Sequence, residues 1–485
     1  MKRKAWRKHH KWFGLVIGFF IVMFCWSGIV LNHRDAFSGV EISRRYLPRG
    51  YRFSAWNGGL VRGTIAHPDG RTLIYGNEGV WASADSLRTV VPLNGGFPDG
   101  VDNRNVRAMA VAGGRILAAS TGGLYQLGED GVWRDTGVDF GGERLSDMEV
   151  AGDTLVIVGR SHIYKSQLCG DATSPISLSE LTLREPADYD GRVTLFRTLW
   201  ELHSGHLFGL GGRLIMDAVA VVLILLYVTG VAYWLILAKV KRRSSGSALP
   251  RRLSGAMRGM FKWHDAIGRK TIILTMFVCL TGWCLRPPLM ILGVIAKVPP
   301  VPFTNLDDAN PWADKLRAVR YDALESDWLI STSDGFYSLA SLDGRPERVD
   351  CAPPVSVMGV NVLRRGESGD WLVGSFRGLY RWSRRTGSVN DYFDGSVPQR
   401  GGMPVGEHDV CGWMSGPVEY TAGTGVAAMP ANMENLPMSL WNVALEVHTG
   451  RIYTFMGIMS TLLWVFVAGA AAAWVLWSGW KLRRP

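Results

Sequence analysis

The chain has 485 residues, and its hydrophobic fraction of 47% is high for a water-soluble protein. A net charge of +11 would suit a nucleic-acid-binding protein, but 19 of the 53 Lys and Arg residues lie in Met1–Trp12, Lys239–Lys270 and Lys481–Pro485. The rest of the chain holds 34 basic against 41 acidic residues, so the charge does not form a general nucleic-acid surface and indicates a membrane protein instead.

Four stretches of the chain contain no Asp, Glu, Lys or Arg: Phe13–Leu31, Ala218–Ala238, Thr271–Leu285 and Ile452–Trp480. Three of them reach the length of roughly 20 residues that a transmembrane helix needs, and Thr271–Leu285 reaches it when extended back to Trp263. We therefore predict four transmembrane helices in contact with membrane lipid. The first stretch is too long for a signal peptide and lacks a cleavage motif, which indicates a retained anchor.

The basic segments flank these stretches on alternate sides. Because Lys and Arg accumulate on the cytoplasmic side of membrane proteins, both termini and the Lys239–Lys270 segment are expected in the cytoplasm. The two long segments after the first and third spans are then exported. The sequence thus predicts a multi-pass protein of the bacterial inner membrane with a large periplasmic domain.

The exported segments, about Arg34–Thr198 and Pro299–Leu440, share a recurring pattern of an apolar strand, a small polar turn and a Gly-apolar-aromatic strand. The pattern occurs at Thr72–Trp81, Arg115–Tyr125, Thr154–Tyr164, Asp327–Tyr337 and Asp370–Tyr380, with a weaker copy near Glu407–Thr421. A spacing of about forty residues is typical of propeller blades. We therefore expect one periplasmic all-β, propeller-like domain assembled from both segments. A plain two-sheet β domain is the alternative.

The membrane part contains an internal repeat. The first and third spans share a histidine followed at offsets of 4, 15 and 18 residues by Gly, Cys and Gly: His10, Gly14, Cys25 and Gly28, and His264, Gly268, Cys279 and Gly282. The second and fourth spans are preceded by ELHSG (Glu201–Gly205) and EVHTG (Glu446–Gly450). The helix–loop–helix unit therefore occurs twice in one orientation, which predicts a pseudo-twofold axis along the membrane normal.

This symmetry groups the histidines in pairs. His10 and His264 are expected at one depth near the cytoplasmic side, and His203 and His448 at another near the periplasmic side. His33 lies 23 residues after His10, or roughly 34 Å along a helix, and so belongs to the periplasmic level. Neutral imidazole is a common ligand of haem iron, so paired histidines indicate two haem sites. The alternative is that they are ordinary interfacial histidines.

The depth of His203 and His448 in the membrane depends on how far the helices of the second and fourth spans continue. If the second and fourth spans continue unbroken toward the histidines, His203 and His448 lie well above the apolar core, by about 20 Å. The glycine-rich run Gly209–Arg213 is expected to bend the first of these helices back.

The predicted organisation has seven segments: 1–33 (cytoplasmic N-terminus and first span), 34–198 (periplasmic β segment), 199–240 (histidine motif and second span), 241–262 (basic cytoplasmic loop), 263–298 (third span), 299–440 (second periplasmic β segment) and 441–485 (histidine motif, fourth span and cytoplasmic tail).

The motifs HKWFG, SGIVLNH, ELHSG and EVHTG, taken in this order, resemble the PepSY-associated transmembrane family. The resemblance covers the four spans and their flanks, somewhat over a third of the chain. It implies an inner-membrane siderophore-iron reductase with b-type haem, with ligand roles for His10, His264, His203 and His448 and with His33 as a further candidate. The exported loops depart from the family, because they show no recognisable PepSY domain.

The expected function is electron transfer across the membrane to a periplasmic ferric siderophore or other iron chelate. The electron donor would be a quinol or a cytoplasmic reductase. The exported loops contain no hydrolase motif and no P-loop, and the oxidoreductase class is what the family resemblance implies. The first alternative is a non-enzymatic, membrane-anchored propeller with a binding or sensory role. A permease subunit is less well supported, because the spans hold no acid or base beyond Asp217.

Overall fold

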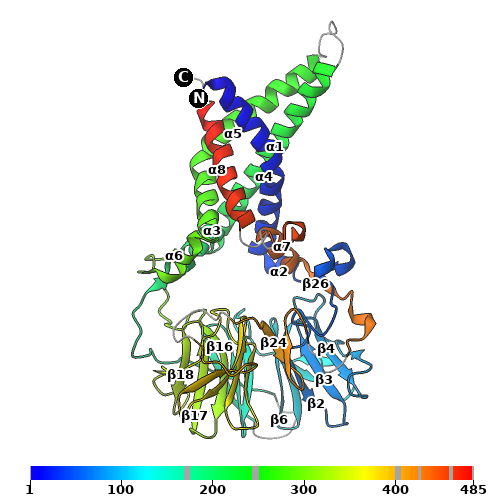
Figure 1. The fold of residues 1–485 in the computed structure, drawn as a ribbon, viewed down its shortest axis with the longest axis vertical. Helices are drawn as coiled ribbons and strands as arrows, with labels where there is room; N and C mark the ends of the chain where they lie inside the picture. The colour runs from blue at the N-terminus through cyan, green and yellow to red at the C-terminus, as the bar shows by residue number, and fades with distance from the viewer. Residues whose placement is uncertain are drawn as a thin grey trace. The chain divides into compact units, whose positions relative to one another are not determined.

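A computed structural model describes residues 2–168, 175–242, 251–398, 406–423, 428–457 and 463–482 (Figure 1). The chain divides into two compact units. The membrane unit comprises Met1–Phe37, Gly191–Asp308 and Leu440–Pro485, and the β unit comprises Ser38–Asp190 and Ala309–Ser439. Each unit is built from both halves of the sequence, as the repeat predicts.

Four long helices form the membrane unit: α1 (Arg3–Asn32), α4 (Gly209–Arg242), α5 (Arg251–Cys284) and α8 (Val465–Lys481). Helix α1 packs against α4 and α8, and α5 packs against the same two helices, so the four close into a bundle. Trp6 of α1 lies 5.4 Å from Trp474 of α8, and Tyr233 of α4 lies 5.7 Å from Phe261 of α5. The start of α1, the end of α8, the end of α4 and the start of α5 therefore lie at one end of the bundle.

Three helical stretches are long and apolar enough to cross a membrane: Arg3–Asn32, His206–Lys239 and Leu253–Cys284. The fourth predicted span includes residues 458–462, which lie outside the described residues, and α8 is described over 17 residues. A fourth crossing therefore stays a prediction. Helix α5 begins at Arg251, so part of the segment expected as a basic loop is helical.

Short elements carry the second histidine pair: α3 (Leu195–Ser204), the 3-10 turn η3 (His206–Phe208) and α7 (Leu440–His448). Thr194 caps α3 by accepting a hydrogen bond from the Arg197 backbone N–H. The helix ends at Gly205, where a φ of +81° and the close approach of the Gly212 carbonyl oxygen leave no room for a Cβ and so require glycine. This turn brings α3 against α5, and α7 packs against α1.

Helix α4 does not continue unbroken toward His203, in agreement with the expected bend. The chain bends at Gly205 and at Gly209, the first residue of the glycine-rich run, because both glycines adopt positive φ. The bend places the end of α3 beside α5, and α7 packs separately against α1. The remaining elements of this unit are α2 (Arg34–Phe37), α6 (Leu289–Ile295), η5 (Thr454–Met456) and the pair β14 (Val193–Thr194) and β15 (Lys297–Val298).

The β unit contains five antiparallel four-stranded sheets and two two-stranded ones within the described residues. The first three are β2 (Gly63–Ala66), β3 (Thr72–Gly76), β4 (Gly79–Ser83) and β5 (Val91–Pro92); β6 (Val106–Ala112), β7 (Arg115–Ser120), β8 (Gly123–Leu127) and β9 (Trp133–Asp135); and β10 (Asp147–Ala151), β11 (Thr154–Val158), β12 (Ile163–Gln167) and β13 (Ser179–Leu181). The next three are β16 (Leu316–Asp322), β17 (Asp327–Thr332), β18 (Gly335–Leu339) and β19 (Glu347–Arg348); β20 (Val362–Arg365), β21 (Trp371–Ser375), β22 (Gly378–Ser383) and β23 (Ser388–Asp391); and β24 (Val410–Trp413) with β25 (Pro417–Glu419).

Strand β1 (Glu41–Ser43) pairs with β26 (Pro437–Ser439), and three 3-10 turns complete the unit, η1 (Arg44–Tyr46), η2 (Arg49–Tyr51) and η4 (Ala431–Met433). The five sequence repeats are confirmed as the second and third strands of the five larger sheets, and the weaker copy is the β24–β25 hairpin. The strands of each repeat alternate short β-branched and aromatic runs with glycine turns, which favours tight antiparallel hairpins.

Successive sheets contact one another through their first strands, in the order β2, β6, β10, β16, β20, β24 and back to β2. Six hydrophobic clusters lie between these neighbours, and the cluster containing Ile74, Trp81, Cys411 and Val418 joins the last sheet to the first. The described sheets are each open, and the β unit is a β-rich domain of small antiparallel sheets.

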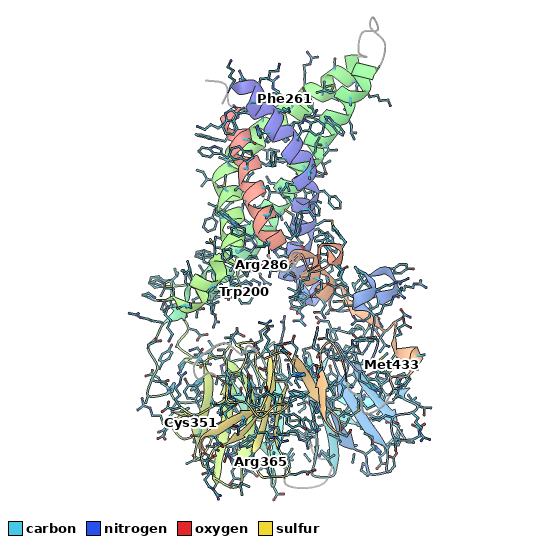
Figure 2. All side chains as sticks on the ribbon, in the orientation of Figure 1. Trp200, Phe261, Arg286, Cys351, Arg365 and Met433 are labelled. Atoms are coloured by element: carbon cyan, nitrogen blue, oxygen red, sulfur yellow. The ribbon has the colours of Figure 1, made fainter. Side chains whose placement is uncertain are left out.

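A buried charge cluster fixes the β16–β17 sheet to its neighbour. Asp322 is fully buried and accepts hydrogen bonds from the guanidinium groups of Arg365 and Arg384 and from the Trp371 indole N–H. Arg365 is labelled in Figure 2. A buried carboxylate with several donors stabilises a fold only while all partners are present.

We predict that Asp322→Asn lowers the free energy of unfolding of the β unit by about 3–5 kcal/mol, because Arg365 loses its ion pair with the buried carboxylate and Arg384 keeps only its pair with Asp327. The measurement is denaturant unfolding of the full-length protein in detergent, followed by tryptophan fluorescence. The matched control is Asp130→Asn, which breaks an exposed pair with Arg134 and should leave the transition unchanged. Equal transitions for both variants would contradict the role of Asp322.

Candidate histidine-pair site in the membrane unit

Four histidines meet in two pairs inside the membrane unit. His10 of α1 faces His264 of α5 with 6.1 Å between ring centres, and His203 of α3 faces His448 of α7 at 6.0 Å. These are the two pairs that the repeat predicts. Both pairs line one cavity of about 1170 Å³ that runs between the long helices.

All four imidazoles use their Nδ1 atom in the same way. Each Nδ1 contacts a backbone carbonyl oxygen and a Ser or Thr hydroxyl oxygen on a neighbouring long helix. The two acceptors lie one helical turn apart, and the distances from Nδ1 to the hydroxyls are 3.0–3.3 Å. The sets are His10 with Val475 and Ser478, His264 with Leu226 and Thr229, His203 with Val278 and Thr281, and His448 with Phe24 and Ser27.

These contacts determine which ring nitrogen carries the proton. Each hydroxyl already donates its hydrogen to a carbonyl of its own helix, as Ser27 does to Met23 and Thr281 to Phe277. The hydroxyl oxygen and the carbonyl can therefore only accept, and Nδ1 must be the donor. Nε2 is then the unprotonated nitrogen of each ring, and all four histidines line the cavity. A neutral imidazole held by its Nδ1–H is the usual form of a metal-binding histidine.

Glycines permit the close approach of the imidazoles to the helices. Each Ser or Thr acceptor is followed by a glycine, at Gly28, Gly230, Gly282 and Gly479. A Cβ at Gly282 would lie 2.6 Å from Cε1 of His203, and one at Gly479 would lie 2.9 Å from Cε1 of His10. A Cβ at Gly282 or Gly479 would push the ring away from its acceptors, whereas a Cβ at Gly28 or Gly230 would meet the ring at an ordinary contact distance of 3.5 or 3.4 Å.

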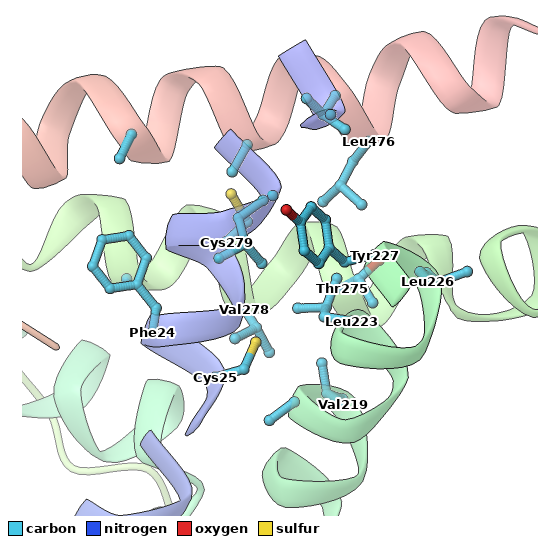
Figure 3. Close-up of a pocket in the computed structure, with 18 of the residues that line it drawn as sticks. Phe24, Cys25, Val219, Leu223, Leu226, Tyr227, Thr275, Val278, Cys279 and Leu476 are labelled. Carbon is cyan, nitrogen blue, oxygen red and sulfur yellow. The ribbon is translucent and has the colours of Figure 1, made fainter. Parts of the chain in front are cut away.

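The two pairs occupy different levels of the bundle. His10 and Ser27 are 17 residues apart on α1, and His264 and Thr281 are 17 residues apart on α5, so the levels are separated by about 25 Å along the helices. The cavity wall between them is apolar, with Val219 and Leu223 of α4 and Leu476 of α8. Figure 3 shows these side chains together with Tyr227 and the repeat-related Cys25 and Cys279.

Every histidine is positioned by the other half of the chain. His10 and His203, from the first half, bind acceptors on α8 and α5, while His264 and His448, from the second half, bind acceptors on α4 and α1. Neither pair can form until both halves have packed together.

His33 lies elsewhere. Its Nε2 is 2.6 Å from Oδ2 of Asp217, and Asn32 contacts the other carboxylate oxygen. His33 is therefore held at the end of α1 by the carboxylate of α4, and the structure does not bring it to another histidine. Of the two glutamates in the E-x-H motifs, Glu446 forms an ion pair with Arg451.

The acceptor residues were missed in the sequence. Gly28 and Gly282 were identified only as parts of the repeat, and the matching Thr229–Gly230 and Ser478–Gly479 in the second and fourth spans were not considered. The available signal was a hydroxyl residue followed by glycine, which occurs on each long helix at the level of a histidine. Ser-Gly and Thr-Gly dipeptides are frequent in transmembrane helices, because small and hydroxyl residues favour helix packing. The pattern is therefore informative only because it occurs four times.

The described residues contain no group of three or more His, Cys, Asp or Glu side chains able to hold a metal ion. Each pair therefore offers two protein ligands and leaves the other coordination positions open. The cavity is large, mostly apolar and lined by several glycines, which suits a broad, flat cofactor better than a bare ion.

No curated protein matches the chain. Among solved structures, the extracellular domain of a hybrid two-component system from B. thetaiotaomicron, BT4673, aligns with 11% identity and a TM-score of 0.34 over 71% of this chain and 29% of that one. A second such domain, BT3049, aligns with 9% identity and a TM-score of 0.31 over 74% of this chain and 37% of that one. The chain thus spans only about a third of the length of these structures.

The family comparison is more informative for the membrane unit. A family model described as PepSY-associated TM region matches residues 1–236, which include α1, α3 and α4 with His10 and His203. This match agrees with the resemblance of the sequence motifs to that family.

Proposed function

We propose that the two histidine pairs each hold one haem b, and that the protein is a membrane oxidoreductase passing electrons to an iron chelate on the external side. One observation carries the proposal. Two pairs of imidazoles, each anchored through Nδ1 to a neighbouring helix, line one cavity with ring centres 6.1 and 6.0 Å apart.

This separation suits one metal between two imidazoles. A metal–imidazole bond of about 2.0 Å, with roughly 1.1 Å more from each nitrogen to its ring centre, sets the two ring centres about 6 Å apart. Each histidine pair would supply two ligands of a haem iron, and the haem ring would supply the others. Glycine at positions 282 and 479 leaves the space that the His203 and His10 rings occupy.

When bound, haem supplies a one-electron carrier at each level of the bundle. The residues of the chain keep the Nδ1 proton on each imidazole through acceptors that cannot donate, which fixes the ring orientation in both oxidation states. The apolar wall of Val219, Leu223 and Leu476 excludes water between the levels. His33, bound to Asp217, is not assigned a ligand role in this proposal.

The proposed reaction moves one electron from a quinol or a cytoplasmic reductase to the ferric ion of a siderophore or other chelate. The resulting ferrous ion binds hard oxygen ligands less tightly and is released. We place the basic end of the bundle, with both termini, in the cytoplasm of a bacterial inner membrane, and the β unit in the periplasm. The β unit is proposed to be a propeller of six sheets, supported by the cyclic contacts of their first strands.

The purified protein should show the optical spectrum of b-type haem, with about two haems per chain by pyridine haemochrome assay. His10→Ala and His203→Ala should each remove one haem, and the double variant both. His33→Ala is the matched control and should retain both. A colourless protein from haem-replete cells would overturn the proposal and favour a membrane-anchored β unit with a binding or sensory role.

Gly282→Ala should reduce the haem content to about one per chain, because the added Cβ displaces the His203 ring from Val278 and Thr281. Gly259→Ala on the same helix is the control, since nothing lies within 4 Å of a Cβ at that position. The readout is the haem-to-protein ratio of detergent-purified protein at equal yield. Loss of haem in both variants, or in neither, would count against this geometry.

Protein reduced with dithionite under anaerobic conditions should be reoxidised by a ferric hydroxamate or ferric citrate complex. His203→Ala should slow the reoxidation of the remaining haem on the order of tenfold or more, because the external carrier is lost. Stopped-flow absorbance of the haem bands measures both rates. If a small soluble oxidant reoxidises the haem but the chelates leave the reduced spectrum unchanged, the chelate is not the electron acceptor. The proposal of electron transfer through the membrane unit would still be supported.

A further inference from the structure

A second, smaller cavity of about 70 Å³ lies within the β unit, where the first strands of successive sheets meet. Its wall includes Arg107 of β6, Asp147 of β10, Arg320 of β16 and Leu363 of β20, with Arg62 just before β2. Five of the six successive sheets thus contribute residues in or beside their first strands. The cavity is therefore a product of the packing between sheets.

The wall of this cavity is strongly basic. Its arginines are Arg62, Arg107, Arg160, Arg317 and Arg320, and among the described residues that line it Asp147 is the single carboxylate. Arg160 also pairs with Asp314, and Arg320 also lies 3.6 Å from Glu149. Five guanidinium groups around a volume this small create a positive potential that favours an anion.

The carboxylates of the cluster offset this charge only in part. Asp147 already accepts the Val319 N–H and the Arg320 guanidinium, which both bind the same carboxylate oxygen. Burial raises the pKa of Glu149 to about 7, against the attraction of Arg320, so this carboxyl is partly neutral near pH 7. The positive charge of the wall therefore persists under neutral conditions.

Arg62 points to the recognised chemistry. Its Nε and one terminal nitrogen donate to the amide oxygen of Asn77, at 3.2 and 2.8 Å. Burial lowers the pKa of Arg62, and the contributions that raise it come from Cys411, Tyr75 and Tyr420, not from a carboxylate. The Asn77 amide occupies this edge of the guanidinium but does not neutralise its charge, and a guanidinium favours carboxylate and phosphate oxygens as partners.

We propose that this arginine-lined cavity is an anion-binding site for a small oxyanion group, either a free inorganic oxyanion such as phosphate or the terminal carboxylate of a larger ligand. A space of about 70 Å³ matches one such group, since a water molecule occupies about 30 Å³ in the liquid. The site belongs to the β unit alone and does not depend on haem in the membrane unit.

The test is isothermal titration of the full-length protein in detergent at low ionic strength, with inorganic phosphate, sulfate and citrate as separate probes and chloride as a reference. Saturable binding of at least one oxyanion is expected. Arg62→Gln and Arg107→Gln should each weaken it at least tenfold, while Arg134→Gln, in an exposed pair outside the cavity, should not.

Binding of phosphate or sulfate but not citrate identifies the ligand as a free inorganic oxyanion. Binding of citrate but not phosphate or sulfate identifies it as the carboxylate of a larger molecule. Absence of saturable binding, or equal affinity in Arg62→Gln, Arg107→Gln and the parent protein, overturns the proposal. Circular dichroism of each variant verifies that the β unit is folded, and two substitutions on different sheets keep the test decisive if one variant misfolds. The haem content is measured separately, so failure of this site and failure of the redox proposal are distinguishable.

Discussion

The hydrogen bond from each histidine Nδ1–H to a helix of the opposite half is the interaction on which the membrane unit depends. It sets the tautomer, leaves Nε2 unprotonated and holds facing rings about 6 Å apart. Because the accepting Ser and Thr hydroxyls are themselves committed to their own helices, the arrangement leaves little freedom for a ring to rotate. The glycines beside them, the bend at Gly205 and the packing of α7 on α1 all serve this one contact.

Much of this unit could be predicted from the sequence. The repeat around His10 and His264 and the two E-x-H motifs paired the histidines correctly, because a duplicated unit with parallel orientation must place equivalent residues at equal depth. The four apolar stretches predicted the positions of the four long helices, of which three are described as long and apolar enough to cross a membrane, while a fourth crossing stays a prediction. The strand pattern of the exported loops gave the hairpins of five sheets and the weaker sixth, since strand alternation and glycine turns act locally.

The rest depends on contacts between segments distant in the sequence. Nothing in the ELHSG motif indicates that His203 will bind Val278 and Thr281, 75 and 78 residues later. His33 looked equivalent to a ligand by its depth, and only the packing of α1 against α4 revealed Asp217 as its partner. In the β unit, the arginines of the small cavity come from separate sheets, and each alone resembles an ordinary surface charge.

The exchange of contacts between halves has a consequence for how such a protein could arise. The family match ends at residue 236, close to the end of the first helix–loop–helix unit. That unit holds one histidine of each level, His10 and His203, and one acceptor for each level, Thr229 and Ser27. Two identical copies related by a twofold axis would complete both sites through an isologous interface, as symmetric homodimers do. The present chain has the architecture of such a dimer fused into one polypeptide, in which the two copies became free to diverge, and the loss of a His33 counterpart at Pro287 reflects that asymmetry.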